Sequence, residues 1–444
     1  MRYGTDHLNA NARALGIVIA FGIALVAPRL GAQSAALPGR LTERTMSGGD
    51  TAQAFAAYIP ASYDPSRRTP VLFVLDPRGR ALDALSRFAP AAERAGWVVV
   101  SSYASRSDGA GEPNVTAMNT MLDWAQREVR VDSRRLYLAG LSGTARAAWT
   151  ILQQFRPNVA GIIAAGATVP IAGTEAMVAG DASFAVYALA GTTDFNYEEV
   201  RTFDDRLGAV GVPHRVAWFD GPHAWPPAAD CGRAVAWMER RAMLGGRRAV
   251  DSGAVRDAFR ADLTRADSLD RAGQWDAAEV LASSTARDGA GWAEGDSARH
   301  RVAVWRARPA LRVLREALRK SLDKERGQQA DIERVLAWER AEADPPDARD
   351  LLKRLDVPSL QRAAGTADSV TALSARRRLA RMQAMLGFYA PRERELSGHP
   401  AHAARLREAA AAITVSSAPP AAASTPRSPE SPAAPGSPAP APDP

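Results

Sequence analysis

Residues 136–145, Leu-Tyr-Leu-Ala-Gly-Leu-Ser-Gly-Thr-Ala, join a short apolar run, a glycine turn around one serine, and a helix-forming segment that continues to Gln154. This order predicts a strand, a tight turn and a helix. Such a turn lifts the Ser142 hydroxyl clear of the sheet edge. It also leaves the Gly143 amide at a helix N-terminus, where the amide can donate to a developing oxyanion. The stretch departs from Gly-x-Ser-x-Gly at Thr144. Ser142 is therefore the candidate nucleophile.

An acid and a base follow the serine in the order that a Ser-Asp-His triad requires. The apolar run 184–190 predicts a buried strand, and Asp194 comes shortly after it. The run 215–219 predicts the next strand, with His223 in the loop beyond it. Both candidates lie at the carboxyl ends of strands, where ligands bind in open α/β sheets. The spacing predicts a triad of Ser142, Asp194 and His223.

Each of these residues has an ordinary structural alternative. Ser142 could be a small residue in a strand–helix turn, and Asp194 could cap the helix predicted over 195–207. In the second case Asp204 or Asp205 would replace it as the acid. His223 competes with His214, which begins the preceding strand and is expected to be a packing residue there. The position past the strand end favours His223 as the base.

The chain resembles the α/β-hydrolases over residues 50 to 245, in particular compact secreted esterases of the polyhydroxyalkanoate-depolymerase, feruloyl-esterase and dienelactone-hydrolase type. The resemblance rests on residues 58–63, 70–79, 140–143, 191–194 and 221–225. It implies that Ser142 is the nucleophile, His223 the general base and then acid, and Asp194 the orienting carboxylate. Trp225, two residues after His223, is expected to be a wall of the cleft rather than a platform for the substrate, although it could be both.

The chain departs from these esterases at the first oxyanion loop. Relatives usually carry His-Gly after the strand that matches residues 71–75, whereas this chain has Asp76-Pro77. Proline has no N–H, so Pro77 cannot donate to an oxyanion. The second donor, beside the Gly143 amide, is therefore expected to be the amide of Arg78 or Gly79.

Strands alternate with helices through the first half of the chain, which predicts an α/β fold with a largely parallel sheet and helices on both faces. The expected strands are 53–59, 70–75, 97–102, 136–139, 159–165, 184–190 and 215–219. The expected helices include 81–96, 114–130 and 228–244. Residues 33–248 are assigned to this hydrolase domain, in which the loop 168–180 is a candidate cover for the site.

Residues 249–413 are of a different kind, because apolar residues there recur at helical spacing with almost no β-branched runs. The segment 269–278 resembles the inter-helix turn of a tetratricopeptide repeat. A separate all-α domain is predicted, with packing against the hydrolase or docking of a protein partner as its role. The polar, glycine-containing segment 245–253 predicts an exposed linker. On that basis residues 33–250 are expected to act alone on small activated esters.

The two ends of the chain carry compositional signals. Residues 1–32 have arginines around an apolar run that is too short to span a membrane, and small residues follow, as in a secretory signal. Secretion or a periplasmic location is therefore expected, without stable membrane insertion after cleavage. Residues 414–444 are rich in Ala, Pro and Ser without aromatic residues, so this tail is predicted to be disordered.

Composition argues against several other classes of protein. The net charge of +7 comes from arginines interleaved with acidic residues rather than clustered, so no nucleic-acid partner is predicted. No His-x-x-x-His or Cys-x-x-Cys pair and no phosphate loop occurs, so no metal and no cofactor are predicted. Cys231, the single cysteine, is expected to be a small packed residue.

The sequence therefore predicts a serine hydrolase that cleaves a small-molecule or polymeric carboxylic ester through an acyl-enzyme on Ser142. Two alternatives stay open. One is a serine peptidase or amidase on the same triad. The other is a catalytically inactive hydrolase fold that acts as a binding module, for which Thr144 and Asp76-Pro77 are the only arguments.

Overall fold

The computed structural model describes residues 37–45, 51–107, 112–155, 158–168 and 183–415. Within these residues, eight strands form one sheet in the order β1-β2-β4-β3-β5-β6-β7-β8. The pairings β1–β2 and β2–β4 are antiparallel, and every other pairing is parallel. The strands are β1 (Leu41–Thr45), β2 (Phe55–Tyr58), β3 (Thr69–Leu75), β4 (Val98–Ser102), β5 (Val131–Leu141), β6 (Val159–Ala165), β7 (Ala185–Gly191) and β8 (His214–Phe219). The predicted α/β class is confirmed.

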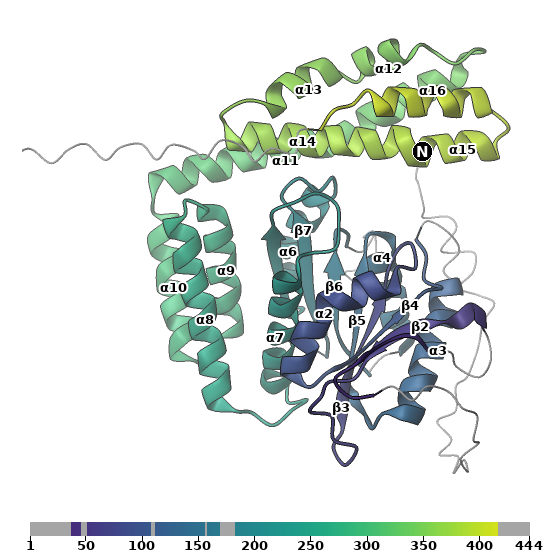
Figure 1. Cartoon of the computed structure of the whole chain (residues 1–444). Helices are drawn as coiled ribbons and strands as arrows, with labels where there is room; N and C mark the ends of the chain where they lie inside the picture. The colour runs from purple at the N-terminus through teal and green to yellow at the C-terminus, as the bar shows by residue number, and fades with distance from the viewer. Residues whose placement is uncertain (1–36, 46–50, 108–111, 156–157, 169–182, 416–444) are drawn as a thin grey trace, which may run out of the picture.

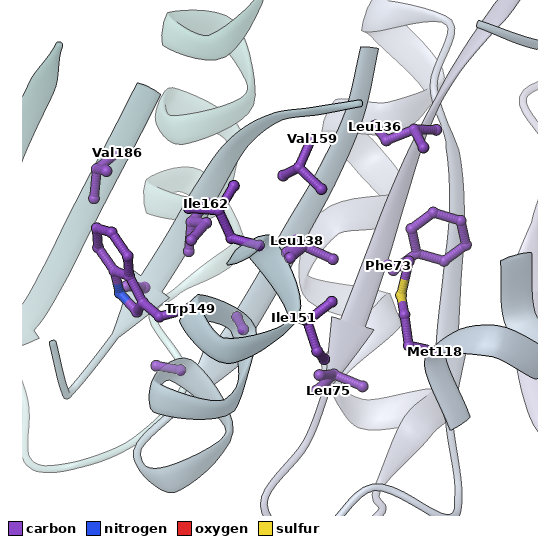
Figure 2. Packing of buried hydrophobic residues seen from close by; sticks show 14 of the residues in the cluster. Phe73, Leu75, Met118, Leu136, Leu138, Trp149, Ile151, Val159, Ile162 and Val186 are labelled. Atoms are coloured by element: carbon purple, nitrogen blue, oxygen red, sulfur yellow. The ribbon is translucent and has the colours of Figure 1, made fainter. Parts of the chain in front are cut away.

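Helices cover both faces of the sheet, as the alternation of strands and helices predicts. Apolar side chains of α2 (Ala81–Ala95) and α7 (Ala228–Leu244) pack on one face. Those of α3 (Glu112–Glu128), α4 (Gly143–Phe155) and α6 (Tyr197–Ala209) pack on the other. Figure 2 shows this second layer, where Trp149 and Ile151 lie among side chains such as Leu138 and Ile162. Strands buried on both faces need apolar residues at every position, which explains the unbroken runs of β3, β6 and β7.

Two details of the sheet differ from the sequence prediction. The strand β5 begins at Val131 rather than 136, because its first residues are polar and half exposed and give no apolar signal. The strand β1 was not predicted at all, since Leu-Thr-Glu-Arg-Thr is polar and pairs only at the sheet edge. The register of the central strands is regular, with Ala139 paired to both Val74 and Ile163. This regular centre carries the turn that holds Ser142.

The second half of the described chain is helical, as predicted. Its elements are α8 (Ser252–Arg271), α9 (Trp275–Asp288), α10 (Ala293–Arg306), α11 (Pro309–Ala341), α12 (Ala348–Arg354), α13 (Val357–Ala364), α14 (Ser369–Ala384), a π-helical turn (Met385–Tyr389), α15 (Ala390–Leu396) and α16 (Pro400–Ala411). Gly273, with a φ of 74°, lies in the turn between α8 and α9, where a tetratricopeptide-like helical hairpin was expected. In Figure 1 these two helices stand beside α7, and α11 and α14 run across the end of the sheet near β7.

The helical region is joined to the sheet by buried ion pairs. Arg215 on β8, with a side chain only 4% exposed, lies 2.8 Å from Asp262 of α8 and 3.2 Å from Asp288 of α9. Arg240 of α7 lies 2.8 Å from the same Asp262. Removing one partner of a buried ion pair leaves an uncompensated charge. The segment 245–253, where a linker was predicted, is mostly exposed and ends in the first residues of α8. The ion pairs argue against the expectation that residues 33–250 act alone.

Three expectations fall on residues outside the described ranges. These are the signal over 1–32, the tail beyond Val415, and all of the candidate cover 168–180 except Thr168. In the described part of the chain, no helix has the length and apolar character needed to cross a membrane.

Candidate active site

The turn between β5 and α4 has the strained backbone that a nucleophile elbow needs. Ser142 has a φ of 56°, and among the described non-glycine residues only Asp356 shares a positive φ. The Ser142 amide donates to the Ala165 carbonyl at 2.8 Å, which ties the turn to the end of β6. Gly140 has no room for a side chain, since a Cβ there would lie 2.4 Å from the Thr144 carbonyl oxygen. The local sequence is therefore built around the position of one serine.

Thr144, the departure from Gly-x-Ser-x-Gly, takes part in the turn. Its side chain is fully buried, and its Oγ1 lies 2.5 Å from the Leu75 carbonyl and 2.8 Å from the Leu141 carbonyl. The same oxygen accepts the Leu141 amide at 3.1 Å. A glycine could make none of these bonds. The threonine thus fastens the elbow to β3, and it offers no argument for an inactive fold.

The predicted base and acid are hydrogen-bonded to each other. His223 Nδ1 lies 2.9 Å from Asp194 Oδ1, and the Asp194 side chain is fully buried. An ionised carboxylate only accepts, so the Nδ1 proton is on the histidine and Nε2 is left as the proton acceptor. The Asn196 amide donates to the same Oδ1 at 2.8 Å. The Phe195 ring packs on the imidazole with a centroid distance of 4.1 Å.

The end of β6 brings the serine next to this pair. The residue after Ala165 is Gly166, with a φ of 61°. A Cβ on Gly166 would lie 2.9 Å from His223 Nδ1 and 3.0 Å from Asp194 Oδ2. Since Ser142 is bonded to Ala165, all three predicted triad residues converge on this one turn. The sequence contained no signal for Gly166 beyond its place at a strand end.

The chain has a second histidine–aspartate pair, which is buried elsewhere. His214 is 4% exposed, and its Nε2 lies 3.0 Å from Asp204 while its Nδ1 lies 2.7 Å from the Val212 carbonyl. Burial alone would raise the pKa of Asp204, but His214 and Arg287 hold that pKa below its ordinary value. Asp205 is exposed on α6. Neither aspartate lies beside His223, and His214 has the packing position expected for it.

The expectation of an oxyanion donor at Arg78 or Gly79 is not supported. The Arg78 amide donates to Asp76 Oδ1 at 2.8 Å, and the Gly79 amide donates to the Asp76 carbonyl at 3.1 Å. Because Pro77 has no N–H, these two amides were the candidates. Both donate instead to Asp76. Gly143 remains as a donor, because as the first residue of α4 its amide has no acceptor within the helix.

Asp76 is a residue of the site that sequence reasoning missed. It is fully buried at the carboxyl end of β3 and accepts hydrogen bonds from Arg80 and Trp225 as well as from Arg78. Burial alone would raise the pKa of Asp76, but these hydrogen bonds hold it below its ordinary value. The ionised carboxylate organises the whole loop that follows β3.

Trp225, which was expected to be a wall of the cleft, has structural contacts. Its side chain is buried, its indole N–H donates to Asp76 Oδ2 at 2.8 Å, and its ring meets Phe88 edge-on. Trp225 therefore helps to hold Asp76 and the loop that follows β3.

Two other kinds of site, a metal site and a cysteine nucleophile, have little support in the described residues. They contain no group of three His, Cys, Asp or Glu side chains that could hold a metal ion. Cys231 is buried as expected, and burial raises the pKa of its thiol to about 12. A thiol with so high a pKa is a poor nucleophile at neutral pH.

The position of each predicted triad residue in the sheet is typical of one class of fold. A serine on a strand–helix turn of a mostly parallel sheet, with the aspartate after β7 and the histidine after β8, is the arrangement of the α/β-hydrolase fold. No protein-family model and no curated protein matches the chain.

Solved structures that the chain is similar to include three hydrolases. A ferulic acid esterase is 17% identical, with 46% of this chain and 98% of that chain covered and a TM-score of 0.36. The fluorophosphonate-binding serine hydrolase F of Staphylococcus aureus is 14% identical, with 45% and 98% covered and a TM-score of 0.35. An S-formylglutathione hydrolase from Agrobacterium tumefaciens is 14% identical, with 45% and 94% covered and a TM-score of 0.36.

Proposed function

We propose that the protein is a serine hydrolase that cleaves carboxylic esters through an acyl-enzyme on Ser142. The observation that carries this proposal is the convergence, at one end of the sheet, of a strained serine with a histidine that is hydrogen-bonded to a buried aspartate. A positive φ at a non-glycine residue costs free energy, and residues strained in this way cluster at functional sites. Ser142 is also the serine that the order of the triad residues in the sequence selects. The motif resemblance to compact secreted esterases supports an ester rather than an amide as substrate.

In the acylation step, Ser142 Oγ attacks the ester carbonyl carbon while His223 Nε2 takes the hydroxyl proton. Asp194 keeps the imidazole in the required tautomer and stabilises the imidazolium that forms. The carbonyl oxygen becomes an oxyanion, to which the Gly143 amide at the start of α4 donates. When the tetrahedral intermediate collapses, the alcohol leaves with the proton from His223.

In the deacylation step, water attacks the acyl-enzyme. His223 takes a proton from the water and returns it to Ser142 Oγ as the carboxylic acid is released. The enzyme ends in its starting state, and no redox group is needed because no electrons are transferred.

The two histidine–aspartate pairs allow a matched test of this mechanism. On a short-chain nitrophenyl ester, Ser142→Ala and His223→Ala should each lower kcat by about 10³-fold or more, because triad members act as a unit. His214→Ala should leave kcat within about threefold of wild type while lowering Tm, since the buried His214 ring binds Asp204 and the Val212 carbonyl, away from Ser142. Steady-state kinetics with circular dichroism on each variant decides the matter. A well-folded His223→Ala variant with wild-type turnover would contradict the proposal.

We also propose that the protein is exported and acts outside the cytoplasm. The support is the sequence of residues 1–32, with its charged start, short apolar run and small residues. Edman sequencing of the protein recovered from a bacterial periplasm or culture medium should begin at residue 33. A full-length N-terminus on the mature, active protein would contradict export by cleavage.

A further inference from the structure

The loop that carries Asp194 is bound at several points within the sheet domain. We call residues 192–196, between β7 and α6, the acid loop. Its Thr192 and Thr193 amides donate to Phe219 and Gly221, the residues that lead to His223. The Asn196 side chain donates to the Gly166 carbonyl at 2.7 Å. These bonds fix one side of the loop against β8 and β6.

The other side of the acid loop is bound by two arginines of α14, far away in the sequence. Arg377 Nη1 donates to the Thr192 carbonyl at 3.0 Å, and Arg381 Nη2 donates to the Phe195 carbonyl at 2.7 Å. The two carbonyls flank Asp194. The Arg377 guanidinium also lies over the Tyr197 ring, 4.2 Å from its centroid, at the start of α6. The helical region thus contacts the acid loop before and after the carboxylate.

Both arginines are held by one residue of α11. Glu325, which is 1% exposed, accepts from Arg377 Nη2 at 2.6 Å and from Arg377 Nε at 2.9 Å. Arg381 Nη1 donates to the Glu325 backbone carbonyl. The bidentate pair with Glu325 fixes the plane of the Arg377 guanidinium. The third nitrogen, Nη1, is thereby directed at the Thr192 carbonyl. An exposed pair, Arg326 with Glu198 at 2.8 Å, lies beside it.

We infer that Arg377 and Arg381 are positioning residues for the triad, and that the helical region is a structural part of the active site. The inference rests on the proposed function. Phe195 links the helical region to the predicted triad, because its ring packs on His223 while its carbonyl accepts a hydrogen bond from Arg381. Loss of the arginine bonds would let the acid loop shift, and a misplacement of about 1 Å at a catalytic group can cost about 10²-fold in rate. Neither arginine contacts the serine.

The test compares Arg381→Met with Arg376→Met. Both arginines are on α14, and both donate to a backbone carbonyl, but Arg376 bonds Ala364 inside the helical region. Arg381→Met should lower kcat by about tenfold or more on a short-chain nitrophenyl ester with KM changed less than about threefold. Hydrogen exchange measured by mass spectrometry should be about tenfold faster for the 192–197 amides. Arg376→Met should change neither kcat nor this exchange.

A second pair of variants serves if Arg381→Met does not fold. Arg377→Lys keeps a charge against Glu325 but loses the fixed donor to Thr192, and it should show the same two effects to a smaller extent. Its control is Arg394→Lys, because Arg394 and Glu339 form an equally buried pair 2.6 Å apart that does not involve the acid loop.

The outcomes separate this inference from the proposed function. An active wild-type protein whose folded Arg381→Met variant keeps full kcat and slow exchange at 192–197 overturns the positioning role alone. A wild-type protein without esterase activity overturns the proposed function and the catalytic part of this inference together. Loss of kcat with fast exchange in Arg381→Met, absent from Arg376→Met, supports the inference.

Discussion

The serine half and the acid half of the site are built in different ways. Ser142 lies on a turn between β5 and α4 whose contacts, such as Thr144 to Leu75, stay within the central sheet. Asp194 lies on a loop that is held by β6 and β8 on one side and by arginines of α14 on the other. The serine half is therefore built within the sheet domain, whereas the acid half also needs residues of α14 that lie 185 and 186 positions later in the chain.

The forces that hold the two halves differ as well. The sheet is stabilised by continuous apolar clusters on both faces. The helical region is attached through buried ion pairs, such as Arg215 with Asp262 and Asp288, beside a small apolar cluster of Met243, Val255 and Phe259. Apolar packing tolerates small changes, but breaking a buried ion pair by removing one partner costs about 3–5 kcal/mol. The acid half should therefore be the more sensitive to mutation and to pH.

The largest effect should distinguish the two carboxylates that bind histidines. Asp194→Asn should lower kcat by about 10³- to 10⁴-fold, because the amide no longer selects the productive imidazole tautomer. Asp204→Asn should lower Tm and leave kcat nearly unchanged, since Asp204 binds His214 and Arg287, which lie away from His223. Kinetics on an activated ester checks both. A reversed pattern would mean that the acid half lies at His214.

Truncation tests whether the acid half depends on the helical region. Residues 33–250 should retain at most about one-hundredth of the full-length kcat, because the acid loop loses Arg377 and Arg381. They should also be poorly soluble, because Arg215 loses both buried carboxylates. Residues 33–415 serve as the control and should keep full activity. A soluble, fully active 33–250 fragment would mean that the sheet domain acts independently and that the acid loop does not need α14.

A single methyl group tests the point where the two halves meet. Gly166→Ala should lower kcat by about 10- to 10²-fold, because its Cβ would lie 2.9 Å from His223 Nδ1 and push the histidine away from its partners. Gly211→Ala is the control, since Gly211 also has a positive φ but has no atom within 4 Å of the added Cβ. It should cost about 1 kcal/mol of stability and no activity. Equal activity losses in both variants would point to backbone strain alone.

Acid should weaken the ion pairs that attach the helical region to the sheet more than it weakens the apolar packing of the sheet. Burial alone would raise the pKa of Asp262, but Arg215 and Arg240 hold it below the ordinary value near 3.9. A carboxylate with a lowered folded-state pKa stabilises the fold above the unfolded-state pKa, and this stability is lost as pH falls through the folded-state pKa.

The free energy of unfolding should therefore fall as pH drops below about 4, and the slope should be smaller in Asp262→Asn. Urea denaturation between pH 3 and 6 measures both quantities. Asp257→Asn, at an exposed position on α8, is the control and should keep the wild-type slope. An unchanged slope in Asp262→Asn would mean that other carboxylates govern acid stability.

The features predicted from the sequence are those that short segments specify. The strands β3, β6 and β7, the elbow around Ser142 and the order of Asp194 and His223 follow from apolar runs and strand ends. The loop after β3 could not be predicted, because Asp76 binds the Arg78 amide and Trp225 only once the fold brings them together. Arg377 and Arg381 gave no signal, since each is one arginine among many on a helix with mixed charge. Contacts between distant segments leave no local pattern.

One serine, Ser142, is expected to carry the chemistry of this protein. Treatment of the full-length protein with a fluorophosphonate probe, followed by mass-spectrometric mapping of the labelled peptide, would identify the nucleophile. The predicted result is labelling at Ser142 alone, with no labelling in Ser142→Ala and much slower labelling in His223→Ala. Labelling at another residue, or labelling that survives in Ser142→Ala, would mean that Ser142 is not the nucleophile.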